Sequence, residues 1–289
     1  MLLSLWPVAA STARSDVKRD HCQEKCGNVS VPYPFGILER SCAMNDYFFL
    51  NCNSNDELFL GIGMPISNIE LEGTLTLRIA AAFSCYNKTG IAPVSMSMTL
   101  GSGPFMFSNT RNIFTATGCD TSAQVTNNES TYGAACLSLC TENVEMSDRN
   151  PCSGSGCCQS SIPKGLKSLN ILSSTLYYTN VSRFNLCGFA FLADNKSLNF
   201  SDWPLSRTPK DGKDATDVVI EWVVENKTCE QAEANTSAYA CGANAECTYP
   251  EIDQGYRCSC NKGFEGNPYL KDGCKAISTV KNNKKKFVF

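Results

Sequence analysis

The cysteines constrain this chain more than any other residue type. Its 289 residues include 18 cysteines, an even number, but a single histidine, His21, and no Cys-x2-Cys pair. Structural zinc sites use such pairs or mixed Cys/His sets, whereas disulfides persist in oxidising compartments. We therefore interpret the cysteines as a disulfide framework and expect a secreted or extracellular protein.

The last six cysteines lie close together, with 11, 5, 10, 1 and 13 residues between successive members from Cys229 to Cys274. This arrangement resembles an epidermal-growth-factor-like (EGF-like) module. So short a segment cannot bury a sufficient core, so its bridges must stabilise it. Spacing alone leaves the pairing open. The resemblance implies the bridges Cys229 with Cys247, Cys241 with Cys258 and Cys260 with Cys274.

Glycosylation acceptors indicate the same compartment. The pattern Asn-x-Ser/Thr marks asparagines that can carry a glycan in secreted proteins. Eight positions match it: Asn28, Asn87, Asn128, Asn180, Asn195, Asn199, Asn226 and Asn235.

The two ends and the charge narrow the possibilities further. Residues 1–20 begin with a short apolar run interrupted by Pro7, and we interpret them as an atypical or clipped signal peptide. No later apolar stretch approaches the length that a bilayer requires, so we expect no transmembrane helix. The net charge of −3 argues against a nucleic-acid partner. Residues 275–289 form a basic tail.

The pattern between the cysteines predicts an all-β, disulfide-rich, loop-rich fold. Apolar and polar residues alternate from Ile69 to Ile79, which predicts one half-buried strand, bulged or bent at Gly73. The segment 164–174 weakly resembles a helix. Further short strands are predicted at 47–50, 58–62, 105–107, 112–117, 176–181, 188–192 and 218–224, the last tying a polar linker back to the first domain.

Two loops carry distinctive residues. The segment 151–159 is glycine-rich but lacks the Lys-Ser/Thr of a phosphate-binding loop. Its adjacent cysteines, Cys157 and Cys158, are expected to bond to two different neighbours. The segment VPYPFG at 31–36 should be extended and end in a turn at Gly36, with its aromatic rings packed against nearby bridges.

These motifs together resemble the extracellular part of a plant wall-associated receptor kinase. The resemblance rests on Cys26-Gly27 with the YPFG segment, on GSGCCQ at 154–159 with CGFA at 187–190, and on the EGF-like module with GNPY at 266–269. It implies this organisation: 1–20 signal peptide, 21–90 galacturonan-binding domain, 91–193 second cysteine-rich β region packed with it, 194–228 linker and last strand, 229–274 EGF-like module, 275–289 basic tail.

The chain also departs from that family. Typical members continue into a calcium-binding module, a membrane helix and a kinase, and are anchored in the plasma membrane; this sequence has none of the kinase motifs. We expect a truncated or alternatively ended product. The residues before Cys229, from Glu225 to Thr228, lack the acidic cluster of calcium-binding modules, and Tyr249 stands where Asn or Asp is usual. We therefore expect no calcium and no other cofactor.

The resemblance implies binding of cell-wall pectic polysaccharide, specifically homogalacturonan, in cell-wall sensing. A polymer of carboxylates needs arginines or lysines. Residues 21–200 hold 10 Lys and Arg against 13 Asp and Glu, so folding must assemble any basic strip. The candidates beside predicted strands or the YPFG turn are Arg40, Arg78, Lys88 and Arg111.

Two other function classes remain to be weighed. An ectodomain of this kind could instead bind a peptide, a microbial molecule or a receptor protein, because fold resemblance does not settle function. An enzyme is not expected, because His21 is the only histidine and the cysteines are oxidised. The pairing of the twelve cysteines between Cys22 and Cys187, the true ligand and the oligomeric state do not follow from the sequence.

Overall fold

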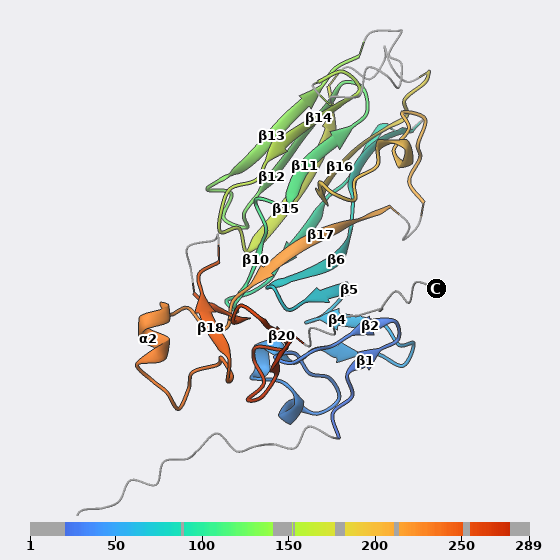
Figure 1. The fold of residues 1–289 in the computed structure, drawn as a ribbon. Coiled ribbons are helices and arrows are strands. Elements are labelled where there is room, and N and C mark those ends of the chain that lie inside the picture. Colours follow the sequence, from blue (N-terminus) through green and yellow to red (C-terminus); the bar gives the residue numbers. More distant parts are fainter. Residues whose placement is uncertain are drawn as a thin grey trace, which may run out of the picture.

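The computed structural model describes residues 21–87, 90–140, 152, 154–176, 183–210, 214–250 and 255–277. The expected signal peptide and most of the basic tail lie outside these residues. Three antiparallel sheets form an elongated body, and the EGF-like module lies beside residues 21–60 at one end of it (Figure 1). The all-β, disulfide-rich fold is as expected.

The largest sheet has six strands and is assembled from distant parts of the chain. In spatial order these are β10 (Phe105–Phe107), β17 (Ala215–Trp222), β6 (Thr74–Ala80), β5 (Met64–Glu70), β4 (Leu58–Leu60) and β3 (Asn51–Cys52). Strand β17, the second strand in this order, pairs with both β6 and β10. The late strand expected around residues 218–224 therefore does return to the first domain.

Two further sheets pack face to face above it. The five-stranded sheet contains β14 (Cys157–Ser161), β11 (Asn112–Thr117), β16 (Cys187–Asp194), β7 (Ala82–Asn87) and β8 (Gly90–Val94). The four-stranded sheet contains β13 (Gly133–Ser138), β12 (Thr121–Thr126), β15 (Ser168–Thr175) and β9 (Met96–Thr99). Strand β15 contacts β7 and β16 across the interface, whose core includes Val125 and Ile171.

The remaining elements are short. They are β1 (Lys25–Cys26), β2 (Val29–Ser30), the 3-10 helices η1 (Arg40–Cys42), η2 (Asp46–Phe48) and η4 (Phe200–Asp202), and, in the module, α2 (Cys229–Glu233), β18 (Ala245–Thr248), β19 (Arg257–Cys260), β20 (Phe264–Gly266) and β21 (Cys274–Ala276). Among the described residues, no helix combines the length and the apolar character that crossing a bilayer requires.

The prediction of a single strand from Ile69 to Ile79 was wrong. The chain forms a hairpin instead: β5 ends at Glu70, and β6 begins at Thr74. Gly73 adopts φ +105°, a backbone conformation that favours glycine, and so permits the turn. The alternation survived because Ile69 pairs with Leu75 across a three-residue turn, which keeps both strands' apolar residues on one face.

Other local expectations also needed correction. The segment 164–174 contains strand β15, in which Leu169, Ile171 and Ser173 are buried in alternation. Residues 47–50 hold the end of η2, because the Asn45 side chain accepts a hydrogen bond from the Tyr47 amide (2.9 Å) and caps that helix. Strand β15 ends at Thr175, so Leu176 is outside it, and residues 177–182 are not described.

All 18 cysteines are bridged. In the module, the bridges are Cys229–Cys247, Cys241–Cys258 and Cys260–Cys274, the pairing that the EGF-like resemblance implies. The other six are Cys22–Cys42, Cys26–Cys52, Cys85–Cys187, Cys119–Cys140, Cys136–Cys158 and Cys152–Cys157. The adjacent Cys157 and Cys158 do bond to different partners, as expected.

The YPFG segment anchors an aromatic core. The turn lies earlier than expected, because the Phe35 amide donates to the Pro32 carbonyl (2.9 Å), while Gly36 pairs with Phe49 in a parallel bridge. Phe35 is fully buried, and its ring meets those of Phe48 and Trp222 edge-on, at 5.2 Å each. Phe35 is therefore a buried packing residue as expected, but the contacts shown for its ring are with other aromatic rings, whereas packing against nearby bridges was predicted.

The module is docked onto the six-stranded sheet. Arg257 on β19 donates to the Trp222 carbonyl (2.7 Å) and the Glu72 carbonyl (3.3 Å), and its guanidinium lies 3.3 Å from the buried Glu221 carboxylate. The Tyr269 ring packs 5.5 Å from that of Trp222. One hydrophobic cluster runs through both parts, so the module and the β domain share a core.

Candidate functional site

Arg40 is the most exposed of the described candidate cations. It begins η1, which the Cys22–Cys42 bridge holds in place, and its side chain is 69% exposed. Its guanidinium forms an ion pair with Asp46 and lies 5.2 Å from the centre of the Phe49 ring. An exposed ion pair is weak, so an external carboxylate can compete with Asp46 for this arginine.

Arg78 projects from β6 beside β17. Its guanidinium lies 3.4 Å from the Asp217 carboxylate on the paired strand, and half of its side chain is exposed. A single long contact leaves most of its five N–H donors available. Arg78 can therefore bind a second acceptor without leaving Asp217.

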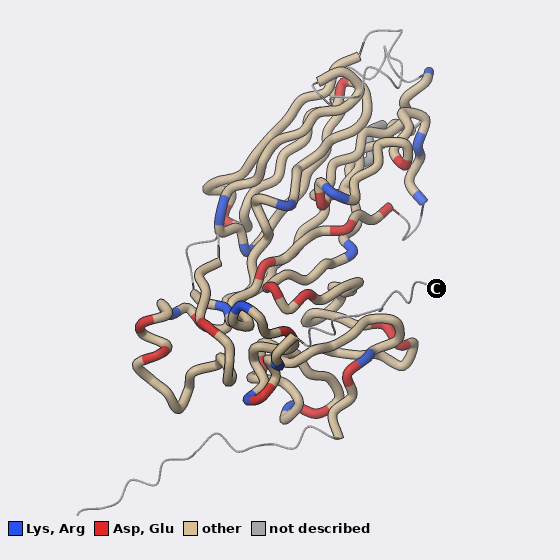
Figure 2. Tube along the Cα trace, in the orientation of Figure 1, with Lys and Arg blue, Asp and Glu red and all other residues tan. Residues whose placement is uncertain are grey.

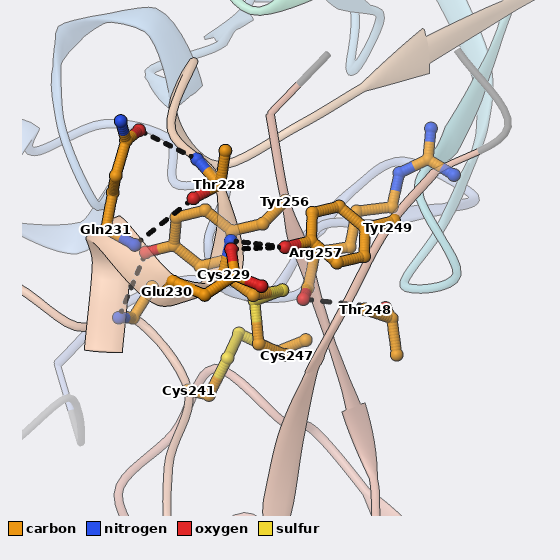
Figure 3. Close-up of a disulfide and its surroundings, with 12 residues drawn as sticks. Thr228, Cys229, Glu230, Gln231, Cys241, Cys247, Thr248, Tyr249, Tyr256 and Arg257 are labelled. Carbon is orange, nitrogen blue, oxygen red and sulfur yellow. Dashed lines mark hydrogen bonds between the residues drawn. A yellow bond between two sulfur atoms is a disulfide. The ribbon is translucent and has the colours of Figure 1, made fainter. Parts of the chain in front are cut away.

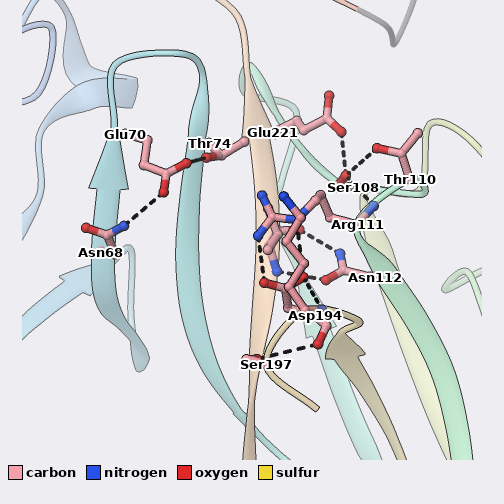
Figure 4. Close-up of polar contacts among 12 residues, drawn as sticks. Asn68, Glu70, Thr74, Ser108, Thr110, Arg111, Asn112, Asp194, Ser197 and Glu221 are labelled. Atoms are coloured by element: carbon pink, nitrogen blue, oxygen red, sulfur yellow. Dashed lines mark hydrogen bonds and ion pairs between the residues drawn. The ribbon is translucent and has the colours of Figure 1, made fainter.

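Arg111 is held more firmly, as Figure 4 shows. It lies just before β11 and donates two hydrogen bonds to Asp194 at the end of β16 (3.2 and 2.7 Å). This bidentate bond, with smaller effects from Glu70 and Glu221, raises the pKa of Arg111. The Asp194 side chain is 9% exposed, so this pair is structural and poorly placed to bind a polymer.

The fourth candidate, Lys88, lies outside the described residues. The three described arginines do not form a strip: Figure 2 shows basic positions interspersed with acidic ones along the body. Each of the three has a carboxylate partner within the chain. A polyanion must therefore compete with internal carboxylates.

A pocket of ≈ 440 Å³ opens between η4 and strands β6, β16 and β17. Arg78 lines it, together with residues that sequence reasoning assigned to a linker, among them Asn199, Trp203 and Arg207. Arg207 lies 4.6 Å from the centre of the Trp203 ring and donates to Asp214 (2.9 Å). The only signal in the sequence was a tryptophan in an otherwise polar stretch.

Comparison with known families identifies the first part of the chain. Residues 22–81 match the family model described as "Wall-associated receptor kinase galacturonan-binding". Residues 22–81 are therefore similar to the region that this family model describes. They hold three Lys and Arg (Lys25, Arg40, Arg78) against seven Asp and Glu (Glu24, Glu39, Asp46, Asp56, Glu57, Glu70, Glu72).

Similarity to wall-associated receptor kinases extends well beyond this region. Among curated proteins of Arabidopsis thaliana, Wall-associated receptor kinase 2 is 34% identical over 263 residues, covering 90% of this chain and 35% of the relative. Wall-associated receptor kinase 3 is 34% identical over 278 residues, covering 90% and 36%, and Wall-associated receptor kinase 1 is 31% identical over 273 residues, covering 90% and 35%.

The chain thus spans about a third of the length of these relatives, and it carries no kinase motif in its sequence. No solved structure matches it. The similarity covers the sheets and the EGF-like module as well as residues 22–81, so the whole described body resembles the corresponding part of wall-associated receptor kinases.

Proposed function

We propose that this chain binds pectic homogalacturonan outside the cell, in the cell wall. The observation that carries the proposal is the match of residues 22–81 to the wall-associated receptor kinase galacturonan-binding family. The disulfide framework supports an extracellular location, because nine bridges would not persist in a reducing compartment.

The charge balance determines what kind of binding to expect. The family region carries a surplus of carboxylates, and two of its three cations, Arg40 and Arg78, already pair with Asp46 and Asp217. Among the residues described there, Lys25 is the cation with no carboxylate at ion-pair distance. Affinity must therefore come from several weak contacts along the polymer, and salt must weaken it strongly.

Retention on immobilised polygalacturonate tests the proposal. Wild-type protein should be retained at low salt, be released as salt rises and not bind fully methyl-esterified pectin, which lacks the carboxylates. Absence of retention at low salt would reject galacturonan binding.

Substitutions at the exposed pair then test the contact itself. Arg40→Gln should reduce retention, whereas Asp46→Asn should increase it, because the arginine is released from its internal partner. Lys262→Gln is the matched control, an exposed cation in the module and outside the family region. If both changes at the pair behave like this control, Arg40 does not contact the polymer.

A second candidate function, binding of a protein partner, is favoured by the four-stranded sheet. Strands β9, β12, β13 and β15 contain no charged residue, and the exposed face of this sheet carries Leu137 and Leu172, which are 44% and 43% exposed. Two copies of a net-negative chain repel each other. Because this face carries no charge on its strands, a second copy can approach it without that repulsion.

Sedimentation velocity tests this alternative with a second copy as the partner. Leu137→Glu with Leu172→Glu should abolish a concentration-dependent dimer, and Leu38→Glu, an exposed leucine elsewhere, should not. A wild-type chain that stays monomeric at high concentration would contradict self-association through this face.

A further inference from the structure

The pocket beside η4 has a lining unlike that of an anion site. Its two arginines are already bonded within the protein: Arg78 to Asp217, and Arg207 to Asp214 and to the Asp202 carbonyl. Asp202 and Asp217 also line the pocket, so its charges balance. Such a lining offers donors and acceptors without net charge, which suits a neutral polyhydroxylated ligand better than a carboxylate polymer.

One lining residue is itself a glycan acceptor. Asn199 is exposed and stands in the pattern Asn199-Phe200-Ser201. It caps η4, and its side-chain oxygen accepts a hydrogen bond from the Ser201 amide (3.1 Å). That bond orients the side chain and leaves its nitrogen, the atom to which a glycan is attached, without a hydrogen-bond partner in the described part of the chain.

A neighbouring acceptor provides a contrast. Asn195 lies four residues earlier and is exposed, but it does not line the pocket. A glycan on Asn195 would begin outside the pocket, in the loop after β16, whereas a glycan on Asn199 begins at the pocket itself. The two positions thus differ in whether the protein offers the first sugar a surface to bind.

We propose that Asn199 carries an N-linked glycan whose first sugars bind in this pocket. The ligand class is a neutral N-acetylhexosamine, supplied in cis. The linkage forms when the Asn199 amide nitrogen attacks the anomeric carbon of a lipid-diphosphate-linked oligosaccharide; the anomeric C–O bond breaks, and the amide proton leaves with the lipid diphosphate. A secretory-pathway transferase catalyses that step.

The structure also indicates which contacts such a sugar would make. Both faces of the Trp203 ring are covered. The centre of the Phe191 ring lies 4.1 Å from the centre of the Trp203 ring, and the Arg207 guanidinium lies 4.6 Å from it. The sugar therefore cannot stack on this ring. Its hydroxyls would instead hydrogen-bond to Arg78 and Asp217, and its apolar edge would contact Leu198. The inference does not depend on galacturonan binding.

Native-state deglycosylation tests it. The full chain is secreted from animal cells with high-mannose glycans and digested with an endoglycosidase that cuts between the first two sugars; glycopeptides are then quantified at each acceptor. We expect release at Asn199 to be at least tenfold slower than at Asn128 and Asn235, both exposed acceptors, and the rates to become equal after reduction and denaturation.

A variant of the pocket distinguishes binding of the sugar from steric hindrance of the endoglycosidase near Asn199. Arg78→Ala with Asp217→Ala removes both polar side chains from the lining without altering the acceptor pattern, and should bring release at Asn199 to the rate of the reference positions. Arg40→Ala with Asp46→Ala, which removes an exposed pair elsewhere, should leave it slow; circular dichroism checks the fold of both. An unoccupied Asn199, equal native rates, or slow release that persists in the pocket variant would overturn the proposal.

Discussion

One arginine of the EGF-like module, Arg257, makes several polar contacts with the largest sheet. Arg257 satisfies two backbone carbonyls, of Trp222 and Glu72, and faces the buried Glu221 carboxylate, which also accepts a hydrogen bond from Ser108 (2.5 Å). Removing one member of a buried ion pair is costly because the other is left desolvated and uncompensated.

We expect Arg257→Gln to lower the free energy of unfolding by about 3 kcal/mol, the usual cost of breaking such a pair. Arg40→Gln, which removes an arginine from an exposed pair, should cost less than about 1 kcal/mol. Urea denaturation of both variants measures the difference. Equal midpoints for the two would show that the Arg257 contacts do not stabilise the native chain.

The ion-pair partners of individual arginines could not be predicted from the sequence. Arg111 and Arg78 were recognised as candidates by their positions near strands, but their partners, Asp194 and Asp217, lie 83 and 139 residues away along the chain. Nothing local marks such pairs, because they depend on which strands become neighbours. That these arginines already pair with carboxylates therefore became evident only with the fold.

At the scale of elements, the alternation of apolar and polar residues predicted that strands exist more reliably than it predicted where they end. The apolar residues around Gly73 were correctly placed on one face, but the turn was missed because a three-residue turn keeps the alternation in phase. Strand β15 was missed because Lys164 to Ser174 lacks the β-branched residues that favour strands, apart from Ile171. The pairing of this segment with β12 and β9 across the sheet makes it a strand.

Gly73 provides a test of how the hairpin and the module fit together. A Cβ at Gly73 would lie 2.1 Å from Arg257 Nε, whereas a Cβ at Gly63 would meet nothing within 4 Å. Both glycines have positive φ, so alanine costs about 1 kcal/mol at either from backbone strain.

We expect Gly73→Ala to exceed Gly63→Ala in destabilisation by about 1–2 kcal/mol, since it also displaces the Arg257 guanidinium from the Trp222 carbonyl. Thermal unfolding of the two variants gives the comparison. In an Arg257→Gln background this excess should shrink; an undiminished excess would exclude Arg257 as its cause.

The residues at the beginning of the module bear on whether it can bind calcium. Thr228 caps α2 through a reciprocal pair with Gln231, and the Tyr249 hydroxyl donates to the Glu230 carboxylate (2.7 Å) (Figure 3). That hydrogen bond lowers the pKa of Glu230 and already occupies one of its oxygens. Side-chain oxygens of Thr228, Gln231 and Glu230 are thus already engaged in hydrogen bonds, whereas calcium takes six to eight oxygen ligands.

We therefore predict that calcium in excess leaves the thermal midpoint unchanged, as magnesium should. Bound calcium would raise the midpoint with increasing concentration. A calcium-dependent rise that magnesium does not reproduce would contradict the prediction and place a site in this module.

At the scale of the whole molecule, the interface between module and sheet should respond to alkaline pH. Burial raises the pKa of Tyr269, which packs on Trp222, to about 12. Because the unfolded value is about 10, the folded chain holds this proton more tightly, so stability is complete below pH 10 and falls as pH rises towards 12.

The loss attributable to this group is at most about 3 kcal/mol, from about 1.4 kcal/mol per pH unit over two units. Urea midpoints between pH 9 and 11.5 measure it. Tyr269→Phe should reduce the slope while keeping the ring contact. The same slope in both proteins would show that Tyr269 does not titrate as the burial implies.

The whole-molecule arrangement was also only partly accessible from the sequence. The class, the EGF-like bridges and the family region followed from residue types and a resemblance, but the twelve other cysteines allowed too many pairings for their bridges to be deduced. A last strand at 218–224 was expected just before the module, and strand β17 is indeed paired on both sides in the sheet. What did not follow from the sequence is that the module shares a hydrophobic core with the domain and is therefore held against it.

The side chain of Asn267 donates to the carbonyl of Tyr33 (2.6 Å), which joins the GNPY motif of the module to the YPFG motif within residues 22–81. The described end of the chain, Ile277, follows ten residues after Asn267, just beyond the hairpin of β20 and β21. Under the proposed binding of a polymer by residues 22–81, a pull on that polymer would reach the module through this contact, so the two parts would transmit tension to each other directly.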